Sequence, residues 1–363
     1  MHLLKKILIF NFSIFLFLYY SNLAYALQTN ETNLEETKKL LEKGLTIFEI
    51  DQELDRLTIK EENIAQEITE TKNSIEVQRQ LADQSREKSG EILKKYYTRE
   101  RDDLIQLLFS SESISEALTV LEFMQAIVSR DQKILNNYQE DYDKLQNLLL
   151  ELLTTQQELL EIKKAYLFEK DRLITLQKEL DDEISQLEDG ESILEQIEQL
   201  TLDWEREGLP VFKNYFQALA KAMQNLPDIL TDNRQHLQLE GLQFVFQITD
   251  TELNDFLKTQ DPLFKPFEFT FQENMITAQG SNDQIEIKLS GIYKIVSEPE
   301  NIIEFQVTEL RYNEYNLPDT TIRALEEEFD LAFYPKKIAP FIEATEIDLR
   351  DGNLKIFLNF LDN

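Results

Sequence analysis

YQEDYDKLQNLLLELLTTQQELLEIKKAYLFEKDRLITLQKELDDEISQLEDGESIL, residues 138–194, carries an apolar residue at every seventh position. The nine residues at this spacing are Tyr138, Leu145, Leu152, Leu159, Tyr166, Leu173, Leu180, Leu187 and Leu194. A repeat of seven keeps one stripe of a helix turned toward a neighbouring helix, as in a coiled-coil seam. The eight prolines of the chain all lie at or after Pro210. The first 209 residues therefore predict long helices, and the remainder predicts a different structure.

An earlier seam runs through residues 34–97. One of its two heptad positions carries Leu40, Ile47, Leu54, Ile68 and Ile75. The other carries Ile50, Leu57 and Ile64. The seam is interrupted by polar residues, which cost stability and define register, at Glu61, Thr71 and Gln78. We expect this helix, about 95 Å long, to pair antiparallel with a second helix over residues 114–201, and intermolecular pairing is the alternative.

The second helix is the longer of the two by about 35 Å. Its last turns, near residues 180–200, would extend beyond the first helix. They must pack on the C-terminal domain, pack on another chain, or bend at Gly190. The hairpin is accordingly assigned to residues 34–204, with Trp204 expected at its junction with the following domain.

Between the two helices, near residues 98–118, the heptad pattern gives way to an apolar knob. Residues 102–109 are too apolar for one face of a coiled coil, and Ser113 with Glu116 fits a capping box for the next helix. Such a knob either closes the hairpin as a small core or forms an exposed docking surface. The candidate partner-binding residues are Leu104, Ile105, Leu107, Leu108, Phe109, Leu118, Leu121 and Phe123.

The composition changes at Gly208 and Pro210, and residues 209–363 read as a separate domain. A helix is expected over residues 211–230, with Phe212, Phe216, Leu219 and Met223 on one face. Apolar residues then alternate with polar ones in five segments, at residues 242–248, 267–271, 285–289, 303–307 and 354–360. Helices are expected over residues 251–258 and 318–329. The predicted fold class is α+β, a long antiparallel coiled-coil hairpin followed by a small α+β domain with a mainly antiparallel sheet.

The N-terminus has the three regions of a secretory signal peptide. Lys5 and Lys6 precede an apolar run over residues 7–20. The small residues Ala24 and Ala26 occupy the two positions that a signal peptidase recognises before its cleavage site. The run of about 14 residues is shorter than the ~20 that span a bilayer. We predict a signal peptide over residues 1–26 and a secreted, extracytoplasmic protein of the cell envelope. The alternative is an uncleaved anchor, which also places the rest outside the cytoplasm.

Composition argues against several classes of function. The chain has 69 acidic and 37 basic residues, a net charge of -32, which repels nucleic acid and anionic lipid headgroups. It has no cysteine, hence no disulfide and no thiol nucleophile. Beyond the signal peptide only His236 is a histidine, so no zinc ligand set is expected. We predict no metal, no cofactor, no nucleic-acid partner and no enzymatic activity, since nothing singles out a catalytic carboxylate pair.

One part of the hairpin resembles a known family. Tyr96-Tyr97, the stretch LIQLLFSS at residues 104–111, ISEAL at 114–118 and Phe123 resemble the coiled-coil domain of PcsB/CwlO-type peptidoglycan hydrolases. The resemblance implies an extracytoplasmic coiled coil, which in some members of the family docks on the division-associated FtsEX membrane complex and restrains a hydrolase domain. The chain departs from that family at its C-terminal end, because it lacks the cysteine or histidine-rich hydrolase module.

The C-terminal domain has a second resemblance. Residues 248–254, Gly291-Ile292-Tyr293, Leu317-Pro318 and residues 351–354 resemble the exported YpmS-like and LmeA-like domains, some of which look like lipid-binding half-rolls. That resemblance implies a curved sheet wrapped on a helix. Independently of the resemblance, Asp351-Gly352 predicts a tight turn of a terminal hairpin. The residues that would line an apolar ligand cavity, or else form an ordinary core, are Phe244, Phe246, Phe269, Phe305 and Leu325.

Two functions follow as hypotheses. The first is a non-catalytic adaptor or regulator of cell-wall remodelling, acting on an FtsEX-like membrane complex or a wall hydrolase, with the rod as a lever. The second is a lipid or apolar-ligand binding protein whose coiled coil serves as spacer or dimeriser. In either case self-association through the coiled coil stays open, and membrane contact is indirect or through the uncleaved signal peptide. An adaptor predicts an apolar tip and a filled C-terminal core, whereas a carrier predicts an open apolar cavity.

Overall fold

The computed structural model describes two compact units. It covers residues 2–98, 102–232, 236–240, 243–282 and 285–360, without the side chains of residues 2–33, 228–232, 240 and 282. One unit is Leu54–Lys170, and the other joins Met1–Glu53 to Asp171–Asn363. The predicted boundary between hairpin and domain, near residues 204–209, is therefore not where the chain divides. The base of the hairpin belongs to the same compact unit as the C-terminal domain.

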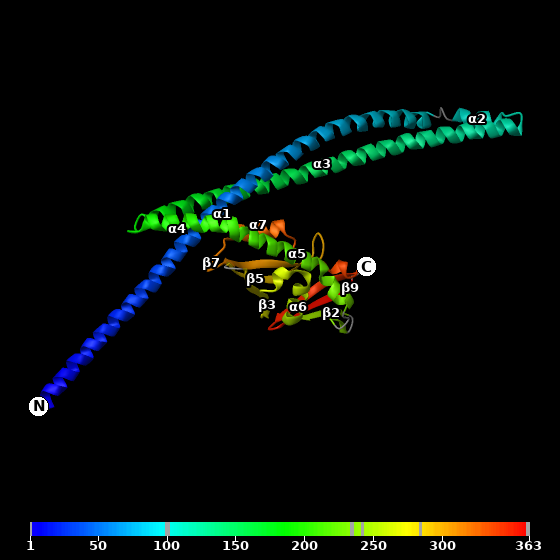
Figure 1. Cartoon of the computed structure of the whole chain (residues 1–363). Helices are drawn as coiled ribbons and strands as arrows, with labels where there is room; N and C mark the ends of the chain where they lie inside the picture. Colours follow the sequence, from blue (N-terminus) through cyan, green and yellow to red (C-terminus); the bar gives the residue numbers. More distant parts are fainter. Residues whose placement is uncertain (1, 99–101, 233–235, 241–242, 283–284, 361–363) are drawn as a thin grey trace. The chain divides into compact units, whose positions relative to one another are not determined.

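The first unit is the predicted helical hairpin. Helices α1 (His2–Tyr97) and α3 (Ile114–Ile184) run side by side through it, and α2 (Asp102–Phe109) lies where the chain turns (Figure 1). Its buried seam consists of Leu57, Ile64 and Ile68 of α1 with Ile162 of α3, flanked by Leu152, Leu159 and Tyr166. The heptad positions read from the sequence therefore face one another, and the antiparallel hairpin is confirmed.

Two of the polar interruptions in the α1 seam have partners across the hairpin. The Gln78 side-chain amide donates to the backbone oxygen of Asp141 at 2.9 Å, and the Ser85 hydroxyl donates to the Asp141 carboxylate. The Glu61 carboxylate lies 3.3 Å from the Lys163 ammonium. Because a shift by one heptad would separate these pairs, they specify the register that leucines alone leave degenerate.

The second long helix ends earlier than predicted. Helix α3 stops at Ile184 and α4 (Gly190–Asp203) begins after a turn, so Leu187 and Leu194 leave the seam and are 38% and 49% exposed. Their assignment to the seam was wrong, because a heptad repeat in sequence does not require one unbroken helix. A Cβ at Gly190 would lie 2.8 Å from the backbone oxygen of Ile184, so this turn requires glycine.

The base of the hairpin packs as a three-helix layer in the second unit. Leu40 of α1, Leu180 of α3 and Ile193 of α4 form a buried cluster. Lys43 bridges to Glu179 at 3.2 Å and Glu183 at 2.8 Å. Three alternatives were expected for the last turns of the longer helix, and the structure combines two of them. The chain turns at Gly190, and α4 then carries Leu200 into the C-terminal core.

The rest of the second unit is built on two antiparallel sheets. Sheet A has the order β1 (Leu237–Glu240), β2 (Gln243–Thr249), β9 (Asn353–Phe360), β8 (Ile342–Arg350). Sheet B has the order β3 (Phe267–Gln272), β4 (Met275–Asn282), β5 (Ile285–Val296), β6 (Ile302–Tyr312), β7 (Tyr315–Asn316). The helices of this part are α5 (Leu209–Asp232), α6 (Asp250–Gln260) and α7 (Asp319–Glu328). The predicted α+β class with antiparallel strands is confirmed.

Four strands had no signal in the sequence. On its buried face β4 places Ile276 and then Ala278 and Gly280, and the last two are too small to continue an alternating apolar pattern. In β8 the pairing with β9 shifts between Ala344 and Glu346, which breaks the alternation. β1 and β7 are only four and two residues long. The β8–β9 turn was predicted from Asp351-Gly352, and Gly352 has the positive φ of 74° that this turn requires.

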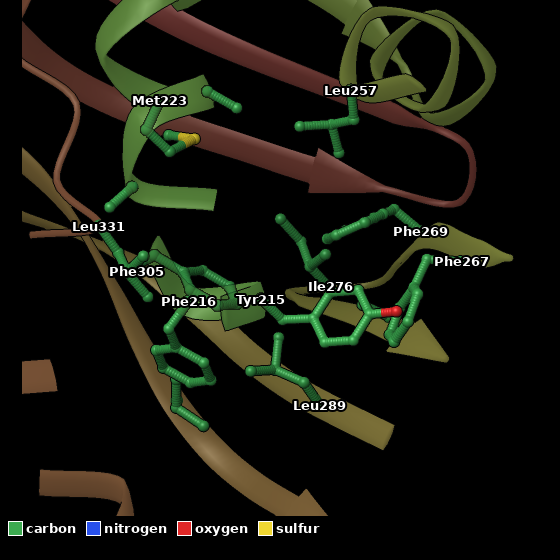
Figure 2. Close-up of a cluster of buried hydrophobic side chains, with 14 of the residues drawn as sticks. Tyr215, Phe216, Met223, Leu257, Phe267, Phe269, Ile276, Leu289, Phe305 and Leu331 are labelled. Atoms are coloured by element: carbon green, nitrogen blue, oxygen red, sulfur yellow. The ribbon is translucent and has the colours of Figure 1, made fainter. Parts of the chain in front are cut away.

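Helix α5 supplies the central layer of the core. Of its predicted apolar face, Phe212, Phe216 and Met223 are buried, and Leu219 is half-buried against the same core. Figure 2 shows Tyr215 and Phe216 of α5 directed at side chains of sheet B, with the Tyr215 ring centred 4.3 Å from that of Phe267. The capping box of α6 is formed by Thr249 and Glu252. The core of the second unit is therefore built from α5, α6 and the two sheets together with α1 and α4.

A buried carboxylate joins α1 to this core. Glu49 of α1 is 3% exposed, and it accepts hydrogen bonds from the Trp204 indole at 2.7 Å and from the Thr321 hydroxyl at 2.6 Å. The Trp204 ring is fully buried between Phe212 and Tyr312, with centroids 5.4 and 5.3 Å away. Trp204 thus lies at the junction, as predicted, and there it unites three helical segments with the sheet.

We expect Glu49→Leu to lower the free energy of unfolding by about 2–4 kcal/mol, because it leaves two buried donors without acceptors. Trp204 is the single tryptophan, so its fluorescence during urea unfolding reports on the junction itself. Asp51→Leu is the matched control, since Asp51 is an exposed acid of the same helix. Equal losses in both variants would contradict a special role for Glu49.

A fragment of residues 209–363 is expected not to fold cooperatively, because it lacks Trp204 and the fully buried Leu45. A chain in which residues 54–170 are replaced by a short loop should retain a sharp thermal transition, since it keeps the whole second unit. Circular dichroism melts of both proteins make the comparison. A cooperative transition in the 209–363 fragment would refute the dependence on α1 and α4.

Candidate functional site

The turn of the hairpin is ordered by local hydrogen bonds. Helix α2 begins with Asp102 and Asp103, whose charges suit its N-terminus. The Glu116 backbone N–H donates to the Ser113 hydroxyl at 3.2 Å, and the Glu112 N–H donates to the Glu116 carboxylate at 3.0 Å. The predicted cap on Ser113 is therefore present, although its reciprocal bond comes from Glu112. Helices α2 and α3 consequently meet at a defined corner.

The apolar residues predicted at this corner do not form a closed core. None of the eight residues of α2, all of which the structure describes, is buried, and Phe109 is 84% exposed. Leu104 and Leu108 are half-buried. The six exposed members of the predicted set are Ile105, Leu107, Phe109, Leu118, Leu121 and Phe123. Of the two readings of the knob, exposure favours a surface.

Several exposed apolar neighbours, which the predicted set omitted, extend this surface. We call the tip surface the exposed apolar residues Leu93, Tyr97, Ile105, Leu107, Phe109, Ile114, Leu118, Leu121, Phe123 and Val128. Tyr97 is 91% exposed and Ile114 is 83% exposed, both more than most predicted members. Tyr97 ends α1 outside the heptad stripe, which is the signal that identifies it. Beside these residues an open groove of about 580 Å³ follows α3, lined by Leu121, Met124 and Val128 among others.

The predicted ligand-lining residues of the C-terminal domain do not surround an open cavity. Phe246, Phe269, Phe305 and Leu325 are buried, and Phe244 is half-buried with its ring 5.3 Å from that of Phe360. Phe269 and Phe305 border a space of about 20 Å³, and a second space beside Phe269 measures about 30 Å³. Each is no larger than the share of one water molecule in the liquid, about 30 Å³. The core is filled, as Figure 2 illustrates for ten of its labelled side chains.

A polar groove of about 490 Å³ lies on sheet B, with Glu268, Glu286, Lys288 and Arg311 in its lining. Lys288 is already paired with Glu309 at 2.8 Å, and this hydrogen bond lowers the pKa of the Glu309 carboxyl. Acidic and basic groups alternate along the groove. Such a mixed lining defines no single class of ligand.

The remaining predictions concern metals and the N-terminus. In the part of the chain that the structure describes, no group of three or more histidine, aspartate or glutamate side chains is placed to hold a metal ion. The ring nitrogen Nδ1 of His236 lies 3.1 Å from the backbone oxygen of Gln247. Among the described residues no helix is long and apolar enough to span a membrane. The cleavage residues Ala24 and Ala26 belong to a stretch whose side chains lie outside the description.

We expect Phe109→Asp to leave the helical content and melting temperature of the chain unchanged, because the ring is 84% exposed and gives up little burial. Ile64→Asp, at a seam position that is 6% exposed, should cost about 3 kcal/mol or more by placing a charge in the seam. Thermal melts followed by circular dichroism test both. Equal destabilisation would mean that the tip surface is core.

The comparisons with family models and with curated proteins assign no family to this chain. The sequence matches no protein-family model, and a comparison with curated proteins gave no match either.

Proposed function

We propose that this protein is a non-catalytic, extracytoplasmic adaptor that regulates cell-wall remodelling through contacts made by its tip surface. The observation that carries the proposal is the exposure of six of the eight predicted partner-binding residues at the turn of a long helical hairpin. Exposed apolar side chains gathered at the turn of an otherwise strongly acidic chain mark an interaction site.

The composition of the tip surface suits a protein partner. Tyr97, Phe109 and Phe123 are large, rigid side chains that fill pockets at little entropic cost, and aromatic residues dominate the binding energy of many interfaces. Phe109 and Phe123 lie on α2 and α3, which meet at the Ser113 cap, so this part of the surface is held in place before binding. The net charge of -32 disfavours anionic nucleic acid or lipid as the partner.

The kind of partner follows from the resemblance of residues 91–135 to the coiled coils of PcsB/CwlO-type hydrolases. We take the partner to be an FtsEX-like membrane complex or a wall hydrolase. The chain has no cysteine and a single histidine beyond its signal peptide, so the hydrolytic chemistry would belong to the partner. The predicted signal peptide over residues 1–26 supports a location outside the cytoplasm.

The mechanism is lever-like. The hairpin in residues 54–170 is stiffened by its leucine seam and by polar pairs such as Gln78 with Asp141. Its base enters the C-terminal core through Leu45, Glu49 and Trp204. A partner that moves the tip would therefore act on the C-terminal domain through a continuous helix. The alternative, an apolar-ligand carrier, has less support because the core spaces measure only about 20 and 30 Å³.

A photo-crosslinking amino acid at Phe109 in the native host tests the proposal. We expect mass spectrometry to identify a membrane complex of FtsEX type or a wall hydrolase, captured at Phe109 and not at Val77, an exposed apolar control position on α1 that is 61% exposed. Leu107→Asp should reduce this capture while helicity is unchanged. Capture of the same proteins from both positions, or of none, would overturn the adaptor function.

A further inference from the structure

Helix α3 carries a second apolar stripe on the side away from its seam. Leu153, Leu160 and Leu167 lie seven residues apart and are 64%, 53% and 65% exposed. Leu150 and Phe168 flank them, at 65% and 63% exposure. We call these five residues the outer leucine stripe. All of them lie in the hairpin unit Leu54–Lys170.

The hairpin itself does not use this stripe. Its seam is formed by the neighbouring positions Leu152, Leu159, Ile162 and Tyr166, which pack with α1. A spacing of seven stays aligned over several turns only against another helix that coils with the same period. Exposed leucines chosen merely for helix propensity would have no reason to keep that spacing. The outer leucine stripe therefore has the form of a second coiled-coil seam.

We propose that the outer leucine stripe is the surface at which two copies of this chain pair, α3 against α3 and antiparallel. An antiparallel two-fold arrangement places Leu160 of one copy against Leu160 of the other, and Leu153 against Leu167. The same patch then serves both partners, as closed two-fold symmetry requires. The inference does not depend on the adaptor function, because the stripe is separate from the tip surface.

Charge along α3 favours this partner and this direction. Before the middle leucine, Leu160, the exposed acids are Glu151 and Glu158, and after it the exposed bases are Lys163, Lys164 and Lys170. The exposed acid Glu161 lies next to Leu160 and belongs to neither segment. Lys163 and Lys164 bridge to Glu61 and Glu161, but both remain accessible, at 50% and 70%. Antiparallel pairing sets the acidic segment of one copy opposite the basic segment of the other. Parallel pairing would align like charges and is disfavoured.

The interface is short, which predicts a reversible dimer. Residues 150–168 span about 27 Å of helix, and one leucine per heptad leaves the intervening positions to polar residues such as Gln157. Such a seam buries less than the larger interfaces of obligate dimers. Self-association should therefore depend on protein concentration and be readily measured by sedimentation.

The absence of cysteine from the whole chain allows a clean test. Under oxidation, full-length Leu160→Cys is expected to give about tenfold more disulfide-linked dimer than Val77→Cys, because pairing raises the local thiol concentration. A mixture of Leu153→Cys and Leu167→Cys chains should form mixed dimers in preference to either like dimer. Preference for like dimers would overturn the antiparallel direction, and yields equal to the Val77→Cys control would overturn the interface.

A second measurement uses charge. Leu153→Lys combined with Leu160→Lys should shift the sedimentation mass from two chains to one without loss of helical signal, whereas Ile59→Lys, at a 60% exposed position of α1, should not. A single-chain mass for the unaltered protein at all concentrations would overturn the proposal, as would a dimer that survives the double change. If the double variant loses helicity, the cysteine comparison decides.

Discussion

The rest of the structure depends on one buried carboxylate. Glu49 of α1 accepts hydrogen bonds from the Trp204 indole and the Thr321 hydroxyl in the core of the second unit. A carboxylate is costly to bury, and it is tolerated only where its acceptors are used. The contact therefore requires a helix of the rod, the junction before α5 and the start of α7 to come together. It makes the base of the hairpin part of the C-terminal domain.

The apolar residues of the hairpin accordingly fall into two groups, those buried in its seam and those left on its surface. The inner seam of the hairpin is satisfied by Leu57, Ile64, Ile68 and Ile162. The tip surface and the outer leucine stripe are apolar residues left over after that seam is filled. Their positions differ in character, because the tip surface ends the rod at a capped corner and the stripe follows its side. A lever held by a partner at its tip and by a second copy along its side combines the two proposals in one architecture.

Much of this fold was predictable from particular residues. Heptad positions such as Leu152 and Leu159, the apolar face of α5 and the Asp351-Gly352 turn are local patterns, and the structure confirms them. Strand β4 was not predictable because its buried face continues after Ile276 with the small residues Ala278 and Gly280. Strand β8 was not predictable because a bulge shifts its alternation. The tip residues were identified as apolar and unusual, but their sequence was equally compatible with a closed core. Tyr97 and Ile114 were missed for the same reason.

By itself the sequence determined that a proline-free stretch with a heptad repeat precedes a mixed domain, and that the given chain contains no cysteine and two histidines. These features follow from periodicity and composition, which can be read from each segment of the sequence without knowing its neighbours in space. Only the tertiary structure decided which apolar residues are covered. It left Phe109 and Leu160 exposed, filled the space around Phe269 and Phe305, and carried Leu45 and Glu49 of α1 into a core more than 150 residues away, next to Trp204. Burial depends on contacts between distant segments, and no periodicity within one segment encodes those contacts.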